Sequence, residues 1–292
     1  MSHTAASLQR QITIARDLES VVRTMKAMAA SGISQYENAV RSLDDYDRTV
    51  QLGLQACFHA SHLETPEPNQ HPSGGAVGAV VFGSDQGLVG QFNDLLVDFA
   101  MATLQPLPGK KRVWAVGERI QARLVGSELG VTASFPLPNA ISSISSLVAQ
   151  VLLAVENWRA QGQIGPVYLF HNRPFSGAIY RPVSQRLLPL DDAWRDEISS
   201  RKWPSNNLPE VMHGDEATLV SFVSEYLFVS LFRACAESLA SENACRLAAM
   251  QRAEKNIGEL LETLNSDYHR LRQGAMDEEL FDVVSGFTAH EQ

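Results

Sequence analysis

The sequence predicts a mixed α/β protein in which long helices at the two ends of the chain pair as an antiparallel coiled coil beside a small α/β domain. Both ends are free of proline over long stretches, and in each stretch apolar residues recur with helical spacing. Between them, short apolar runs alternate with helical patterns, as in a largely parallel sheet. We therefore divide the chain into a first long helix over 1–58, a globular α/β domain over 75–209 and a second long helix over 210–292.

The N-terminal helix is predicted from a seven-residue repeat in the proline-free stretch from Leu8 to Leu54. The members of the repeat are Leu8, Ala15, Val22, Ala29, Tyr36, Leu43 and Val50. The residues three positions further on extend this row into an apolar stripe with interruptions at Gln11, Gly32 and Gly53; they are Leu18, Met25, Ala39 and Tyr46. A stripe this narrow is typical of a helix that packs along one partner helix.

The C-terminal helix is predicted from the segment after Pro209, which contains no proline up to Gln292. Its apolar residues step by threes and fours through Leu219, Phe222, Tyr226, Leu227, Leu247, Met250, Ala253, Ile257, Leu260, Leu264, Tyr268, Leu271 and Ala275. If residues 216–284 form one helix, that helix is roughly 100 Å long and cannot be buried within a compact domain. We therefore expect it to pair antiparallel with the N-terminal helix.

The middle of the chain is predicted to be a small Rossmann-like α/β domain. Five apolar runs are predicted strands, over 75–82, 112–116, 131–135, 166–170 and 178–188. Two segments between them, 92–99 and 141–155, have helical periodicity. The charged segment 191–211 is interpreted as a connector.

A glycine-rich loop follows the first predicted strand, with Gly83, Gly87 and Gly90 at its turns. Such a loop before a helix can bind a phosphate through its backbone N–H groups. However, the spacing is not that of a dinucleotide fold, and no Gly-Lys-Ser/Thr follows. We favour a structural turn without a bound nucleotide. A nucleotide-binding α/β enzyme with a coiled-coil dimerisation arm stays open as an alternative, as does a coiled-coil scaffold.

The composition favours protein partners. With a formal net charge of -9, the chain lacks the basic surface of a nucleic-acid binder. No apolar run approaches the roughly 20 residues that cross a bilayer, so we expect no direct membrane insertion. Three cysteines, Cys57, Cys235 and Cys245, leave an odd number and form no C-x-x-C pair, which favours a reducing, cytoplasmic compartment.

One group of potential metal ligands occurs near the end of the first helix. Cys57, His59, His62 and His71 are close in the sequence, and His59 and His62 can share a helix face. The group lacks the third ligand and the acidic residue at fixed spacing that helix-borne zinc sites carry. We therefore expect no metal and no cofactor.

Three motifs, in order along the chain, carry a family resemblance. They are TMKAMAAS at 24–31, SDQGLVGQFN at 84–93, and the run that starts with ESLASENACRLAAMQRAEKN at 237–256 and continues to Phe287. They resemble A-M-x-M-V-A-A-S, S-D-R-G-L-C-G-G-x-N and E-x-L-A-S-E-x-x-A-R-M-x-A-M of the gamma subunit of rotary (F-type) ATP synthases. The resemblance is strongest over about the first 45 and last 55 residues.

This resemblance implies a non-catalytic central rotor shaft. Its coil would stand within a ring of alpha and beta subunits, and its globular domain would lie against the epsilon subunit and the membrane c-ring. The complex would be peripheral to the cytoplasmic face of the inner (plasma) membrane. Matched residue by residue, Met25, Arg246, Arg272, Gln273 and Glu279 fall at the family's coupling contacts with the beta subunit.

The chain also departs from the family pattern. Ser20 and Gly32 stand where the family usually has lysines on either side of its A-M motif, and Met276, Asp277 and Glu278 replace most of I-T-x-E. These departures indicate a divergent branch, for which the alternative sodium-translocating type of some bacteria is one candidate.

Overall fold

The computed structural model describes residues 4–60, 75–175, 178–207, 211 and 215–290. Its internal contacts divide the chain into two compact units. The first unit combines Met1–Ala29 with Arg246–Gln292, and the second is Ala30–Cys245. Each unit is described by itself below.

Two long helices begin and end close to the predicted positions. Helix α1 is Ala5–Ala60 and helix α6 is Asp215–His290. In the second unit Tyr46 Oη donates a hydrogen bond of 2.8 Å to Glu225, and in the first unit Lys26 Nζ donates one of 2.7 Å to Glu254. Since residue numbers fall along α1 as they rise along α6, the helices are antiparallel, as predicted.

The seven-residue repeat of α1 is buried as predicted, whereas the second predicted row is in part wrong. All seven members of the repeat are buried or half-buried. Leu18 and Tyr46, however, are 52% and 46% exposed. The second buried row lies four positions after the repeat instead of three, at Ile12, Glu19, Lys26, Ile33, Val40, Asp47 and Leu54. Charged residues are tolerated in it because Lys26 has an acidic partner on α6 and Asp47 a basic one.

The predicted row of α6 needs a similar correction in the first unit. Leu260 is 49% exposed, and the half-buried residues are Leu261, Leu264 and Tyr268 instead. From Leu271 onward every residue up to Asp282 is exposed, so Leu271 and Ala275 are not seam residues. The antiparallel alignment explains the exposure beyond about residue 275: counting from Lys26 and Glu254, α1 begins opposite roughly that residue of α6, so it does not cover the helix further on.

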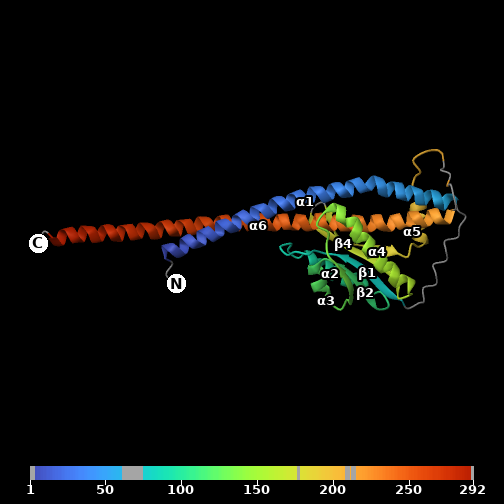
Figure 1. Ribbon diagram of the computed structural model, residues 1–292, viewed down its shortest axis with the longest axis horizontal. Coiled ribbons are helices and arrows are strands. Elements are labelled where there is room, and N and C mark those ends of the chain that lie inside the picture. The colour runs from blue at the N-terminus through green and yellow to red at the C-terminus, as the bar shows by residue number, and fades with distance from the viewer. Residues whose placement is uncertain (1–3, 61–74, 176–177, 208–210, 212–214, 291–292) are drawn as a thin grey trace. The chain divides into compact units, whose positions relative to one another are not determined.

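The second unit contains a five-stranded sheet (Figure 1) with the order β3-β2-β1-β4-β5. Its strands are β1 (Ala76–Phe82), β2 (Lys111–Val116), β3 (Val131–Phe135), β4 (Ile164–Phe175) and β5 (Ala178–Leu188). The first four are parallel, and β5 pairs antiparallel with β4. This is the strand order of a doubly wound Rossmann-like sheet with an antiparallel edge.

Helices cover both faces of the sheet, because side chains alternate along each strand. Val77, Ala79 and Val81 pack with helices α2 (Phe92–Leu104) and α3 (Glu118–Val125). Val80 and Phe82 pack on the other face with α4 (Ile144–Ala160) and with α6. A short 3-10 turn, η1 (Ile141–Ser143), precedes α4. The central strand β1 is therefore buried on both faces, and α6 is part of the core.

Two short helices were not predicted. They are α3 and α5 (Asp192–Ser199), and each has eight residues. Helix α5 lies in the segment interpreted as a connector, and its start is fixed by Asp191, whose side chain accepts a 3.1 Å hydrogen bond from the N–H of Trp194. Helices this short are stabilised by packing rather than by an extended periodic pattern, which explains why the sequence did not predict them.

Among the described residues, two helices, α4 and α6, are long and apolar enough to cross a membrane by length and composition alone. In α4 the apolar side chains are buried against the sheet, at Ile144, Leu147, Val148, Val151 and Val155. In α6 much of the apolar surface is buried in the same core. Packing of core helices accounts for their composition.

Candidate functional site

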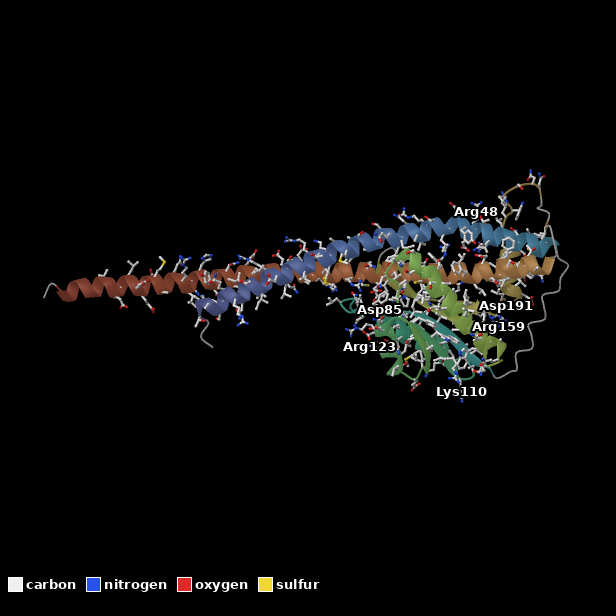
Figure 2. The ribbon with its side chains drawn as sticks, in the orientation of Figure 1. Arg48, Asp85, Lys110, Arg123, Arg159 and Asp191 are labelled. Carbon is white, nitrogen blue, oxygen red and sulfur yellow. The ribbon has the colours of Figure 1, made fainter. Side chains whose placement is uncertain are left out.

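The glycine-rich loop connects β1 to α2 and contains Asp85, which is labelled in Figure 2. Its carboxylate accepts a 2.8 Å hydrogen bond from the N–H of Glu118, the first residue of α3, and a 3.1 Å bond from the N–H of Leu137. These amides lie after β2 and β3. Asp85 therefore joins the carboxyl ends of three strands and places a negative charge at a helix N-terminus.

Ser84 and Asn93, at the two ends of the loop, also bond to each other. The N–H of Ser84 donates to Asn93 Oδ1 at 3.1 Å, and Asn93 Nδ2 donates back to Ser84 Oγ at 2.8 Å. Beside this pair, Val89 packs against Phe92 and Cys245 of α6. The loop thus holds the start of α2 and the surface of α6 together.

Two of the loop glycines are explained by packing and backbone conformation. A Cβ on Gly83 would lie 2.2 Å from the Cβ of Ile120, so only glycine allows α3 to approach the strand end. Gly90 has a φ of +62°, a left-handed conformation that glycine adopts at little cost. Gly83 and Gly90 therefore serve the turn, and neither needs a ligand to account for it.

The five residues assigned to contacts with a beta subunit all belong to the first unit. Met25 and Arg246 are half-buried where α1 and α6 run side by side, whereas Arg272, Gln273 and Glu279 are exposed. The structure does not bring these five side chains to one place. At about 1.5 Å per residue, Arg246 and Glu279 are roughly 50 Å apart along α6. Such a spread over two helices fits contacts with an extended partner better than a catalytic centre.

A buried polar cluster joins α6 to β4 in the second unit. Glu237 Oε2 accepts hydrogen bonds of 2.7 Å from both His171 Nε2 and Arg173 Nε. His171 and Glu237 are 2% and 7% exposed. Because a carboxylate can only accept, the proton of the neutral imidazole is assigned to Nε2.

The cluster shifts the pKa values of both buried partners. Burial lowers the pKa of His171, and the hydrogen bond to Glu237 offsets that effect only in part. Burial alone would raise the pKa of Glu237, but the hydrogen bonds from His171 and Arg173 lower it below its usual range. At neutral pH Glu237 is therefore ionised and His171 is neutral. The opposite charges of Glu237 and Arg173 thus compensate each other where α6 meets β4.

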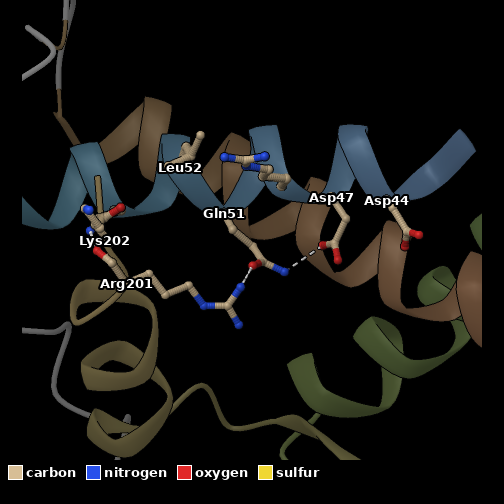
Figure 3. A pocket seen from close by; sticks show the side chains of 8 residues that line it. Asp44, Asp47, Gln51, Leu52, Arg201 and Lys202 are labelled. Carbon is tan, nitrogen blue, oxygen red and sulfur yellow. Dashed lines mark hydrogen bonds between the residues drawn. The ribbon is translucent and has the colours of Figure 1, made fainter. Parts of the chain in front are cut away.

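A cleft of about 340 Å³ lies between α1 and the segment after α5 (Figure 3). Arg201 donates a hydrogen bond to Gln51, and Gln51 Nε2 donates to Asp47 at 2.9 Å. Asp47 in turn accepts a 3.1 Å bond from Arg233 of α6. These bonds connect α1, α6 and the segment after α5, and Arg233 compensates the charge of Asp47. The cleft therefore lies where three elements are held together by hydrogen bonds.

The metal site considered from the sequence is only partly described. Cys57 is buried and His59 is exposed at the end of α1, whereas His62 and His71 lie outside the described residues. Within the described parts of the chain, no group of three histidine, cysteine, aspartate or glutamate side chains could hold a metal ion.

Sequence reasoning missed the structural roles of two sets of residues. Asp85 was seen as part of a loop motif, although an acid directly after a buried strand could have indicated a link between strand ends. The segment ESLASE (237–242) was seen as a family motif. Its acids and serines within an apolar stretch of α6 could have indicated buried hydrogen bonds, since such groups are buried only when they are paired.

Comparison with known proteins agrees with the fold and the motifs. A family model described as ATP synthase matches residues 4–289. The ATP synthase gamma chain of Nitrosomonas eutropha is 27% identical over 301 residues, covering 97% of this chain and 98% of its own. That of Pasteurella multocida is 25% identical over 303 residues, covering 98% and 99%.

Solved structures show the same fold. A chain in the OSCP/F1/c-ring structure of the Euglena gracilis mitochondrial ATP synthase superposes with a TM-score of 0.67 at 16% identity, covering 98% of this chain and 94% of that one. A chain in the rotor structure of the same complex gives a TM-score of 0.65 at 16% identity, covering 93% and 98%. Because the family model matches nearly the whole described length, and the relatives are gamma chains, this chain belongs to the ATP synthase gamma chain family.

Proposed function

We propose that this chain is the central rotor shaft subunit of an F-type ATP synthase or ATPase, which couples ion-driven rotation to ATP synthesis or hydrolysis in an alpha/beta head. The observation that carries the proposal is the outer part of α6. From Leu271 to Asp282 every residue is exposed, and these include Met276 and Leu280, at 52% and 61% exposed. Apolar side chains exposed along a long helix favour a surrounding protein surface.

An asymmetric helix within a threefold ring acts by differential contact. It presents a different face to each beta subunit, so each active site is biased toward a different conformation. Rotation passes these biases from one site to the next, provided that the contact free energy differs between rotor angles. The chain itself is then a non-catalytic subunit, and the chemistry takes place in the head.

The partners follow from this role. The long helices, 1–58 and 210–292, contact the alpha and beta subunits, and the globular domain, 75–209, contacts the epsilon subunit and the membrane c-ring. The chain is peripheral at the cytoplasmic face of the inner membrane, without direct membrane insertion and without nucleic acid. Core packing of α4 supports the absence of insertion, since its apolar face is already covered.

The alternative of a nucleotide-binding enzyme is not favoured. The glycine-rich loop has neither the spacing of a dinucleotide fold nor a following Gly-Lys-Ser/Thr. Its Asp85 carboxylate, held by the N–H groups of Glu118 and Leu137, would repel a phosphate. This supports a chain that binds no cofactor.

The coupling contacts are proposed to be Met25, Arg246, Arg272, Gln273 and Glu279. Arg272 and Gln273 are exposed and can donate hydrogen bonds to acidic or polar groups of a beta subunit. A charge-assisted hydrogen bond contributes about 1.5–3 kcal/mol, which shifts a conformational equilibrium by roughly one to two orders of magnitude if the bond forms at only some rotor angles.

The proposal is tested in a complex reconstituted from this chain, its head and its membrane sector. We expect Arg272→Ala with Gln273→Ala to lower ATP-driven ion pumping more than ATP hydrolysis. Arg119→Ala, in the exposed surface of α3, removes a charge outside the shaft and is the control. If pumping and hydrolysis fell equally and in step with lost assembly, these residues would only hold the complex together.

A second variant pair tests the half-buried contact. Met25→Lys adds a cation that can form an ion pair with a beta subunit and resist rotation, so it should impair pumping more than Met25→Ala does. Equal effects of the two variants would contradict this role for Met25. A separate measurement, of ion pumping with and without sodium, tests whether the chain belongs to the sodium-translocating type proposed for its divergent branch.

A further inference from the structure

The segment 237–242 of α6 contacts the sheet through hydrogen bonds as well as through apolar packing. Ser238 Oγ donates a 3.1 Å bond to the carbonyl of Phe82, the last residue of β1. Ser241 Oγ donates a 3.1 Å bond to the carbonyl of Asn172 in β4. Both hydroxyls are on side chains that are 0% exposed. Adjacent strands therefore each accept a bond from the same helix.

An ion pair lies beside the two serine contacts. Glu237, on the same helix, accepts the 2.7 Å bonds from His171 and Arg173 of β4. Three consecutive residues of β4, from His171 to Arg173, thus contact two residues of α6, Glu237 and Ser241, through polar atoms. Asn172 extends the set, since its Nδ2 donates a 3.1 Å bond to the carbonyl of Phe92 at the start of α2.

These contacts can fix the rotation of α6 about its own axis. At about 100° per residue, Glu237, Ser241 and Ser238 lie within a 100° arc of the helix. Apolar packing alone is non-directional, whereas a hydrogen bond weakens steeply with misalignment. Turning α6 by one residue would separate the three groups from their partners and leave buried polar groups unpaired, which is strongly unfavourable.

We propose that Glu237, Ser238 and Ser241 are positioning residues that lock α6 to the ends of β1 and β4, so that torque passes between the globular domain and the shaft helix. The proposal rests on the proposed rotor function. It assigns to buried side chains remote from the head a role in transmission, distinct from the contacts that α6 makes with a beta subunit. A rotor in which this joint is loosened can still bias the active sites but loses torque under load.

The test compares a double variant, which carries both Ser238→Ala and Ser241→Ala, with a matched control variant. Each substitution removes one hydroxyl and keeps a helix-favouring residue. The control is Ser221→Ala with Ser224→Ala, which removes two hydroxyls from exposed positions of the same helix in the second unit, outside the unit that holds the proposed coupling contacts. If the combined variant does not fold, Ser241→Ala alone is measured.

Two readouts are needed. In the purified chain, hydrogen exchange of the α6 amides around 237–242 should become roughly tenfold faster in the variant and stay unchanged in the control. In the reconstituted complex, the variant should retain ATP hydrolysis while the number of ions pumped per ATP falls. The control should keep the wild-type ratio.

The outcomes separate this proposal from the rotor function. Unchanged exchange would mean that the serines do not fix the helix, and faster exchange with an unchanged pumping ratio would mean that they only stabilise the fold. Either result overturns the proposal while the rotor function stands. If the wild-type chain itself did not restore ATP-driven pumping to its head, the rotor function would fail.

Discussion

Replacing Ile12 by alanine tests which row of α1 packs against α6 in the first unit. Ile12 is 6% exposed and Leu18, in the row predicted from the sequence, is 52% exposed. Both belong to the same helix and the same unit. Each change to alanine removes three carbon atoms, so the two variants differ mainly in the burial of what is removed.

The magnitude follows from that burial. Three buried carbons contribute about 2.4 kcal/mol at roughly 0.8 kcal/mol each, and the better helix propensity of alanine offsets a few tenths of a kcal/mol. Ile12→Ala should therefore destabilise the paired helices by about 2 kcal/mol. Leu18→Ala removes a half-exposed side chain and should cost about 1 kcal/mol or less.

The assay is hydrogen exchange of the α1 amides between residues 5 and 29, measured by mass spectrometry on the purified chain. A loss of about 2 kcal/mol corresponds to roughly 30-fold faster exchange, and about 1 kcal/mol to roughly fivefold. Equal acceleration in the two variants, or a larger one for Leu18→Ala, would refute the four-residue row.

Three further predictions concern the second unit. Gly83→Ala should lower the free energy of unfolding by at least about 1–3 kcal/mol in urea titrations, because its Cβ would overlap that of Ile120; an unchanged midpoint contradicts this. Calorimetry of the purified chain with magnesium-ATP should show no binding, and micromolar binding abolished by Gly87→Val would disprove the structural turn. Stability should fall as the pH is lowered below about 6.5, because burial holds the pKa of folded His171 below that of the unfolded chain, which then binds more protons. His171→Gln should weaken this dependence between pH 7.5 and 5.5, and an equally steep dependence would assign it to other groups. Below about pH 4.5 the lowered pKa of Glu237 adds a loss in the same direction.

The long helices and the sheet could be predicted because their patterns are local. Residues seven positions apart lie on the same face of a helix, so the seven members of the repeat from Leu8 to Val50 predict one buried face. All seven are buried or half-buried. The apolar strand β1 likewise has no polar face that could be exposed to solvent, which predicts a strand covered on both sides. By contrast, α5 is too short and too polar for its pattern to differ from that of a loop.

The candidate site was predicted less completely. Family motifs identified Arg272 and Gln273 as shaft residues, and their exposure on α6 is compatible with that role. The family resemblance also singled out the motif that begins at Glu237, but it assigned no structural role to that residue. Its partners, His171 and Arg173, lie more than sixty residues earlier in the chain, and no spacing rule connects them.

By itself, the sequence determined that the chain ends are helical, that the middle alternates between strands and helices, and that the whole is a gamma chain. These properties depend on side-chain periodicity and on motifs, and each such pattern is contained within one continuous segment of the chain. Only the tertiary structure decided which of two adjacent rows on α1 is buried, since Lys26 and Asp47 become acceptable there once Glu254 and Arg233 face them. It likewise decided that Asp85 connects distant strand ends and that Glu237 connects α6 to β4. For Glu237 the reason is that a buried charge is stable only where distant segments bring its partners within hydrogen-bonding distance.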